Sequence, residues 1–180
     1  MLTNKSKFDQ HKKILKIIRL ILTLGLVALL FWLTNKNFAG GGNLVVQATF
    51  GKDKPMISQR GPESRLRTEA DYQTVLDDQV YFDLRSMPWF SKIRVSMVFL
   101  PVSRSLDGLG AQTGPGWQYD VKKPLLVSDL GAGWQKAVFD FERDKVYHSK
   151  NVERFLILTK PTNQTSGELK IKSIEVILSR

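Results

Sequence analysis

Apolar residues follow two different patterns along the 180-residue chain, and the change comes near residue 34. Before it, residues 20–33 are apolar on every side of a helix and leave no polar stripe to face water. After it, short apolar and β-branched runs alternate with Gly, Pro, Asp and Ser, and no 3.6-residue period lasts long enough for a substantial helix. The pattern predicts one N-terminal helix followed by an all-β domain.

The helical segment extends back to Ile14, because the long side chains of Lys16 and Arg19 can reach the headgroup region. About 21 residues at 1.5 Å each cross the ~30 Å hydrocarbon core of a bilayer. A core helix of a water-soluble domain is disfavoured, since too little of the chain remains to cover it. A cleavable signal peptide stays open, because Ala39 and Gly41 are the small residues of a cleavage site after Gly41. The long basic segment ahead of the apolar run favours an uncleaved signal-anchor with membrane lipid as its partner.

Half of the net charge of +10 lies before the apolar run, where residues 1–19 hold six basic residues against one acidic residue. Basic residues flanking a span stay on the cytoplasmic side. We therefore expect a cytoplasmic tail over residues 1–13, a glycine-rich linker over 35–43 and an extracytoplasmic domain over 44–180. A nucleic-acid-binding protein would instead carry its basic cluster on a folded face, so no nucleic-acid partner is expected.

Eight short segments after the linker have the composition of β-strands. They are residues 44–50, 72–76, 79–84, 92–100, 116–121, 134–141, 154–159 and 169–178. Asp77-Asp78 is interpreted as a turn between two of them, and the glycine-rich stretch 108–116 as a loop. Short strands with loops between them favour an antiparallel sandwich of about eight strands.

The last predicted strand contains a slip in its apolar alternation. Leu169 and Ile171 share one parity, whereas Ile174, Val176 and Leu178 share the other. One extra residue in the strand, a bulge near Lys172-Ser173, would bring all five side chains to one face.

The stretches "VYFDLRSMPWFSKIRVSMVFL", "WQKAVFDF", "NVERFLIL" and "GELKIKSIEVILSR" resemble the strand signatures of galactose-binding-like jelly rolls, which include many carbohydrate-binding modules. The resemblance covers residues 44–180 in strand order and in the closing L-x-I-x-x-I-x-V pattern. It implies a jelly-roll sandwich whose first and last strands pair antiparallel. Members of this group often bind a structural calcium near those strands. Here Lys172 and Ser173 occupy the position where such modules have an acidic residue, and only Glu175 remains, so no metal and no cofactor are expected.

No set of catalytic residues emerges from the sequence. The chain has no cysteine, and His148 is the only histidine after the linker, so thiolate sites and a histidine metal cluster are excluded. Asp140, Glu142 and Asp144 alternate along one extended segment, and paired carboxylates can hydrolyse glycosides. Their spacing beside Arg143 is better interpreted as a solvated ladder of charges, so we expect a protein that is not an enzyme.

Four aromatic residues close to predicted turns are the candidate ligand contacts: Trp89, Trp117, Tyr119 and Trp134. Trp117 and Tyr119 are the first choice, because alternation along a strand places both on one face, where the apolar side of a sugar ring can stack. The alternative is that these aromatics plug the ends of the sandwich core. The sequence thus predicts a surface domain that binds a glycan or another envelope component such as a protein. A structural subunit of a membrane assembly, without a small ligand, is the second hypothesis.

Overall fold

The computed structural model describes residues 3–37, 42–49, 54–162 and 167–180. The chain divides into two compact units, Met1–Gly41 and Gly42–Arg180. The first contains α1 (Thr3–Asn37), in which the 20 residues Ile14–Leu33 are long and apolar enough to cross a membrane. The hydroxyl of Thr23 donates to the carbonyl oxygen of Arg19 at 2.8 Å, so this polar side chain is satisfied within the helix. The predicted N-terminal apolar helix is confirmed.

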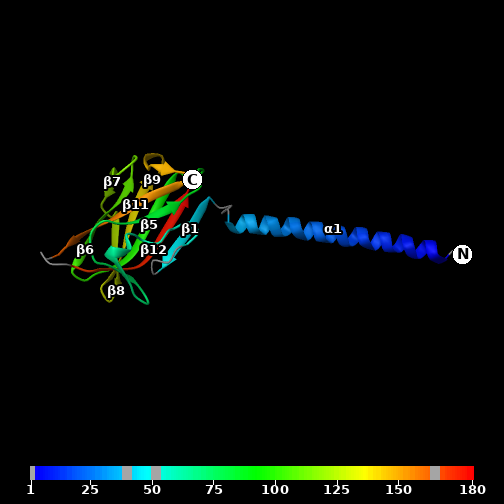
Figure 1. The fold of residues 1–180 in the computed structure, drawn as a ribbon, viewed down its shortest axis with the longest axis horizontal. Helices are drawn as coiled ribbons and strands as arrows, with labels where there is room; N and C mark the ends of the chain where they lie inside the picture. Colours follow the sequence, from blue (N-terminus) through cyan, green and yellow to red (C-terminus); the bar gives the residue numbers. More distant parts are fainter. Residues whose placement is uncertain (1–2, 38–41, 50–53, 163–166) are drawn as a thin grey trace. The chain divides into compact units, whose positions relative to one another are not determined.

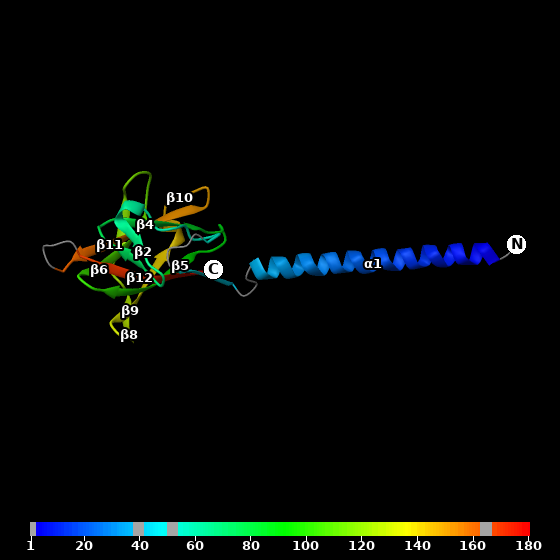
Figure 2. The same ribbon diagram turned by 60° about the horizontal axis from the view of Figure 1, so that its bottom comes forward.

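The second unit is a sandwich of two antiparallel sheets (Figures 1 and 2). The seven-stranded sheet consists, in order, of β2 (Leu66–Thr68), β3 (Gln73–Val75), β12 (Leu169–Ser179), β5 (Lys92–Pro101), β9 (Trp134–Glu142) and β8 (Leu126–Gly131), with β1 (Asn43–Thr49) also paired to β12. The five-stranded sheet consists of β10 (His148–Ser149), β11 (Val152–Pro161), β6 (Arg104–Gln112) and β7 (Tyr119–Lys122), with β4 (Val80–Arg85) also paired to β11. Two 3-10 turns, η1 (Glu63–Arg65) and η2 (Arg143–Lys145), complete the described elements.

The first and last strands pair antiparallel, from Asn43 opposite Ser179 to Thr49 opposite Ser173. This confirms the pairing that the resemblance implied. The other edge of β12 is covered by β5 over its whole length, so β12 lies in the middle of its sheet. The chain end is therefore held by hydrogen bonds on both sides.

The predicted bulge in β12 is also confirmed. The register against β5 shifts between Ile171 and Ser173, and Lys172 is exposed at the shift. As a result the side chains on both sides of the bulge enter the core; these are Leu169, Ile171, Ile174, Val176 and Leu178. One extra residue thus restores the alternation that is interrupted in the sequence.

All eight predicted strands are present among the twelve strands of the described residues, but β2, β6, β8 and β10 are missing from the prediction. The expected loop over residues 108–116 is wrong in its first half, because β6 runs to Gln112. Its glycines belong to the strand for a steric reason. A Cβ atom at Gly108 would lie 2.7 Å from the backbone oxygen of Lys122, and one at Gly110 would lie 3.3 Å from the Cβ of Tyr119. The neighbouring β7 therefore leaves no room for a side chain at Gly108 and little room for one at Gly110.

The core lies between the two sheets and is built on aromatic rings. Phe82 stacks on Phe155 with ring centroids 5.4 Å apart, and Phe141 meets Phe155 edge to face at 5.3 Å. The buried apolar cluster extends from Ala48 to Leu178, all within the second unit. This unit therefore carries its own core and has what a domain needs to fold without α1.

Candidate functional site

The outer surface of the five-stranded sheet collects polar and aromatic side chains. Its strands lie in the order β4, β11, β6, β7, with Asp83 opposite Arg154 and Gln112 opposite Tyr119. Their sequence neighbours Phe82, Phe155 and Ala111 are buried in the core, so these residues point outward. We call this surface the aromatic face; it comprises Tyr81, Asp83, Arg154, Trp117 and Tyr119.

Trp117 and Tyr119 lie side by side at the β7 edge of the aromatic face, as predicted. Their ring centroids are 6.3 Å apart and their planes are tilted by 43°. Trp117 is 72% exposed, so it does not plug the core. Among the described residues its only ring or cation contact is Tyr119. One broad side of the indole is therefore open to a ligand.

Hydrogen bonds within the β6–β7 turn fix the backbone on both sides of Trp117. The side-chain amide of Gln112 donates to the carbonyl oxygens of Gly114 and Gly116, at 2.9 and 2.7 Å. The backbone amide of Thr113 donates to the carbonyl oxygen of Gln118 at 2.9 Å. Gly116 has a φ of 87°, in the region that side chains disfavour. The turn therefore presents the indole on a fixed backbone.

Arg154 occupies the middle of the aromatic face. Its guanidinium donates twice to the Asp83 carboxylate, at 2.8 and 3.0 Å, and its central carbon lies 4.4 Å from the centre of the Tyr81 ring. The hydrogen bond to Asp83 raises the pKa of Arg154. Burial raises the pKa of Tyr119, and the charge of Asp83 adds to this effect while that of Arg154 opposes it. At neutral pH the face thus offers a phenol and a fixed, planar cation as hydrogen-bond donors.

The surface of the aromatic face is uneven. Leu156 points outward by register but is buried without belonging to the core cluster, so its neighbours cover it. A hollow of about 380 Å³ lies at the β4 edge; its lining includes Asp83, Arg85 and Val152. Three spacings between neighbouring strands separate this edge from Tyr119, or roughly 14 Å. The face is long enough for more than one sugar ring.

The other two predicted contacts lie elsewhere. Trp134 belongs to β9 in the seven-stranded sheet, with its ring 6.3 Å from that of Tyr72. Two lysine amines lie near these rings: Lys172 is 5.7 Å from the Trp134 centroid and Lys170 is 4.5 Å from the Tyr72 centroid. Trp89 lies in the β4–β5 connection, with its ring 6.1 Å from that of Phe90. The structure brings together two of the four residues, not all of them.

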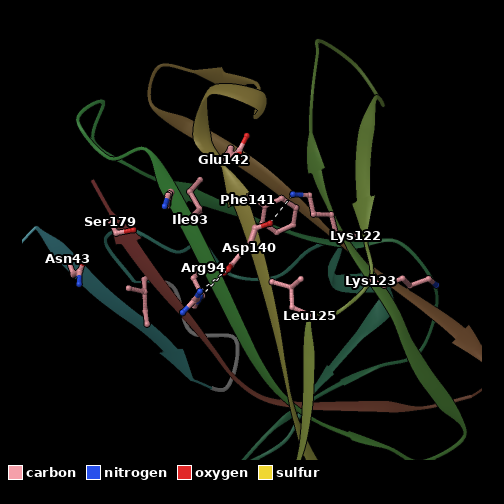
Figure 3. Close-up of a pocket in the computed structure, with 12 residues that line it drawn as sticks. Asn43, Ile93, Arg94, Lys122, Lys123, Leu125, Asp140, Phe141, Glu142 and Ser179 are labelled. Carbon is pink, nitrogen blue, oxygen red and sulfur yellow. Dashed lines mark hydrogen bonds and ion pairs between the residues drawn. The ribbon is translucent and has the colours of Figure 1, made fainter.

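A second concavity, of about 630 Å³, lies on the outer face of the seven-stranded sheet (Figure 3). We call it the basic groove; it is lined by Asn43, Lys92, Ile93, Arg94, Lys122, Lys123, Leu125, Asp140, Phe141, Glu142, Ile177 and Ser179. Strands β1, β12, β5 and β9 form its floor, and the β7–β8 connection forms one wall. Four basic side chains face two carboxylates in this lining.

Both carboxylates of the groove are held by basic residues. Arg94 donates twice to Asp140, at 2.7 and 2.8 Å, and these hydrogen bonds lower the pKa of Asp140. Glu142 forms an ion pair with Lys145, whose hydrogen bond lowers the pKa of Glu142. Asp140 and Glu142 thus lie on β9 as paired charges, as expected, whereas the prediction was wrong for Asp144, which lies in η2 and not on the extended segment.

Within the described part of the chain, no group of three or more His, Asp or Glu side chains is arranged to hold a metal ion. Glu175, the acidic residue left near the closing pattern, faces Lys136 at 3.6 Å. The remaining polar residues of the aromatic face, Tyr81, Asp83 and Arg154, were not predicted from the sequence. Their signal was available, because they alternate with the apolar residues of their strands.

No protein-family model matches the chain, and no curated protein matches it significantly. Among solved structures, a xylan-binding module of the type CBM15 aligns with 77% of this chain and 99% of its own, at a TM-score of 0.54 and 17% identity. A CBM27 module with specific mannan recognition aligns with 77% of this chain and 99% of its own, at a TM-score of 0.43 and 10% identity. The C-terminal CBM6 of LamC from Zobellia galactanivorans aligns with 76% of this chain and all of its own, at a TM-score of 0.42 and 11% identity. The first of these similarities shows that the domain has the β-sandwich fold of carbohydrate-binding modules, as the resemblance in sequence implied.

Proposed function

We propose that this protein is a membrane-anchored binding protein whose β-sandwich holds a glycan, or another component of the cell envelope, on the aromatic face. The observation that carries the proposal is the position of Trp117. It is a large, 72% exposed indole on a hydrogen-bonded turn, beside Tyr119 and on the same face as the ion pair of Arg154 with Asp83. The name of the CBM15 neighbour, a xylan-binding module, supports a polysaccharide as ligand.

The chemistry of the face suits a sugar. The C–H side of a pyranose ring stacks on an indole, and an exposed tryptophan that becomes covered gains the full hydrophobic benefit of burial. The guanidinium of Arg154 and the hydroxyl of Tyr119 can donate to sugar hydroxyls or ring oxygens. Because Arg154 is already held by Asp83, little side-chain entropy is lost when a ligand binds. These features support binding rather than catalysis.

Membrane anchoring is the second part of the proposal. The apolar segment Ile14–Leu33 crosses the bilayer, the basic residues before it stay in the cytoplasm, and the sandwich lies outside. Intact-mass measurement of the protein from the membrane fraction is expected to find the N-terminal segment retained. A mature chain that begins at Gly42 would instead identify a cleaved signal peptide.

The binding test uses a fragment of residues 42–180 against a panel of soluble xylans, mannans, glucans and cell-wall glycans, followed by calorimetry on those that bind. Trp117→Ala is expected to weaken binding by about 2 kcal/mol, or roughly 30-fold, as for a central aromatic contact. Trp134→Ala is the matched control, because it removes an indole from the opposite sheet, and it should change the affinity less than threefold.

Two results would contradict the aromatic face as the glycan site. Equal affinity of the Trp117→Ala variant and the wild type would show that the ligand lies elsewhere. A loss confined to Trp134→Ala would move the site to the seven-stranded sheet. No binding to any glycan would leave the alternative function below.

A structural subunit remains the second candidate, and the edge strand β8 favours it. Leu126, Val127 and Leu130 of this strand, together with Leu125 just before it, are all exposed, between 48% and 69%. Figure 2 shows β8 at the edge of the sandwich beside β9. An apolar edge strand is a ready surface for a protein partner. Under this hypothesis Leu126→Lys abolishes co-purification of membrane proteins with the full chain, whereas Trp117→Ala does not.

A further inference from the structure

We infer that the basic groove binds the phosphate groups of anionic lipids and so docks the sandwich onto the membrane surface. The inference rests on the proposed membrane anchoring, but not on glycan binding. It assigns a role to the concavity on the seven-stranded sheet, which takes no part in the proposed glycan binding.

The register of the seven-stranded sheet places the groove at the end where the linker enters. Asn43 lies opposite Ser179, Ser179 opposite Lys92, and Lys92 opposite Glu142, so one row of groove residues crosses four strands. Asn43 is the first residue of β1. The groove therefore begins at the first residue of the first strand of the domain.

The chain length keeps this row near the bilayer. Leu33 is the last residue of the apolar span, and α1 continues to Asn37. Four helical residues and the six residue steps from Asn37 to Asn43 cover at most roughly 26 Å, even when the second part is fully extended. An anchored domain therefore begins within roughly 26 Å of the hydrocarbon core, so this end of the groove can reach the headgroup region, which extends several ångströms from that core.

Two of the four basic groove residues have no carboxylate partner within ion-pair distance among the described residues. Arg94 is engaged by Asp140, and Lys123 lies 2.6 Å from Asp107. By contrast, the amine of Lys122 donates at 2.9 Å to the backbone oxygen of Asp140, a neutral acceptor, and no ion pair joins Lys92 to any described acid. These two ammonium groups are available to an external anion.

The shape and the apolar part of the groove match a lipid headgroup. Figure 3 shows the side chains of Lys122 and Arg94 reaching Asp140 from opposite sides. The Lys122 amine lies 4.9 Å from the centre of the Phe141 ring, and Leu125 beside it is 69% exposed. A phosphate can meet the amines while the glycerol lies against the apolar wall. Each lysine near an anionic surface increases binding about fivefold at physiological salt.

The test uses the full chain in nanodiscs of phosphatidylcholine, with or without 30% phosphatidylglycerol. Because the chain has no cysteine, Ser179→Cys gives a single site for an environment-sensitive fluorophore at the groove. Ser128→Cys is the matched control, a serine on β8 of the same sheet outside the groove. Flotation of the nanodiscs checks separately that the chain is anchored.

Phosphatidylglycerol is expected to shift the emission of the label at position 179 but not at position 128, and 0.5 M NaCl should reverse the shift. Lys92→Gln should lower the ratio of docked to undocked protein about fivefold, and Lys92→Gln with Lys122→Gln about 25-fold. Both variants should keep the glycan affinity of the wild type, which separates this inference from the proposed function.

Three results would overturn the inference. The first is the same emission at position 179 in both types of nanodisc while flotation shows an anchored chain. The second is a shift produced in phosphatidylcholine nanodiscs by millimolar glycerol phosphate, which would identify a site for soluble phosphate. The third is the same shift produced there by polygalacturonate, which would identify a site for an acidic glycan.

Discussion

Glu153→Gln tests whether the domain depends on the buried ion pair of Glu153 with Arg143. Glu153 is fully buried on β11, and its carboxylate accepts from Arg143 Nε at 2.7 Å and from the Ser86 hydroxyl at 2.6 Å. Arg143 Nε also lies 2.8 Å from the Ser86 oxygen. Arg143 is the first residue of η2, directly after the groove residue Glu142. The pair thus ties the turn that follows β9 to the opposite sheet.

The expected loss follows from burial. Glutamine keeps an acceptor for Ser86 but leaves the guanidinium of Arg143 buried without a counter-charge. Breaking one partner of such a pair costs about 3–5 kcal/mol. A domain of this size is stable by about 5–15 kcal/mol, so the variant should lose a large share of its stability. At about 3 °C for each kcal/mol, the Tm should fall by roughly 10 °C.

Urea unfolding of the 42–180 fragment, followed by circular dichroism, measures the free energy of unfolding. Ser86→Ala is the control that keeps the ion pair but removes the two hydrogen bonds of the Ser86 hydroxyl, to Glu153 and from Arg143, and it should cost about 1–2 kcal/mol. The double variant Arg143→Met with Glu153→Leu removes both charges together and should recover most of the stability that Glu153→Gln loses. A Glu153→Gln domain within about 0.5 kcal/mol of the wild type would refute the reasoning, since the guanidinium would then have found another partner or water.

Two further predictions concern the groove and the aromatic face. Arg94 lowers the pKa of Asp140 in the folded state. The pair therefore stabilises the domain fully at pH values above the ordinary carboxyl pKa near 4. This stabilisation is lost as the pH falls through the lowered pKa of Asp140. Asp140→Asn should therefore reduce the difference in the free energy of unfolding between pH 5 and pH 3, by less than about 1 kcal/mol because the pair is exposed. An unchanged difference, measured by urea unfolding at the two pH values, would contradict it. Gly108→Ala places a methyl group 2.7 Å from the backbone oxygen of Lys122, so it should cost about 1–3 kcal/mol and weaken glycan binding through β7. A Gly108→Ala domain with wild-type stability and affinity would show that β7 moves freely.

The alternation of apolar and polar residues was sufficient to predict most strands, because every second residue of a strand faces the core and is apolar. The bulge in β12 could be predicted for the same reason, since a change of parity between Ile171 and Ile174 has only one simple remedy in a strand with one buried face. Strand β6 could not be predicted in this way. Its glycines are set by contact with β7, and that contact depends on which strands become neighbours. Strand β8 was missed because its apolar residues are exposed rather than alternating between core and solvent.

The candidate site could likewise be predicted from the sequence only in part. Trp117 and Tyr119 are two residues apart, so their common face followed from the sequence. The ion pair of Asp83 with Arg154 joins residues 71 positions apart and exists only because β4 pairs with β11. Sheet order also explains why Trp134 and Trp89 do not join the aromatic face. All four aromatics were predicted as ligand contacts because they lie near turns. These turns belong to different ends and different sheets of the sandwich, so the four side chains do not meet at one site.

The two proposed sites use the two sheets of one sandwich, and this separation has a mechanical consequence. The basic groove lies on the outer side of the seven-stranded sheet, and the aromatic face on the outer side of the five-stranded sheet. Lys122 ends the same strand as Tyr119, β7, but alternation along the strand points the two side chains to opposite sides. A domain docked through Lys92 and Lys122 would therefore leave Trp117 and Tyr119 uncovered. The backbone between the sheets is fixed by a close-packed core, so lipid docking can orient the aromatic face without changing its geometry. Docking should then alter how readily a long, surface-bound glycan is reached, while the affinity for a short soluble one stays the same.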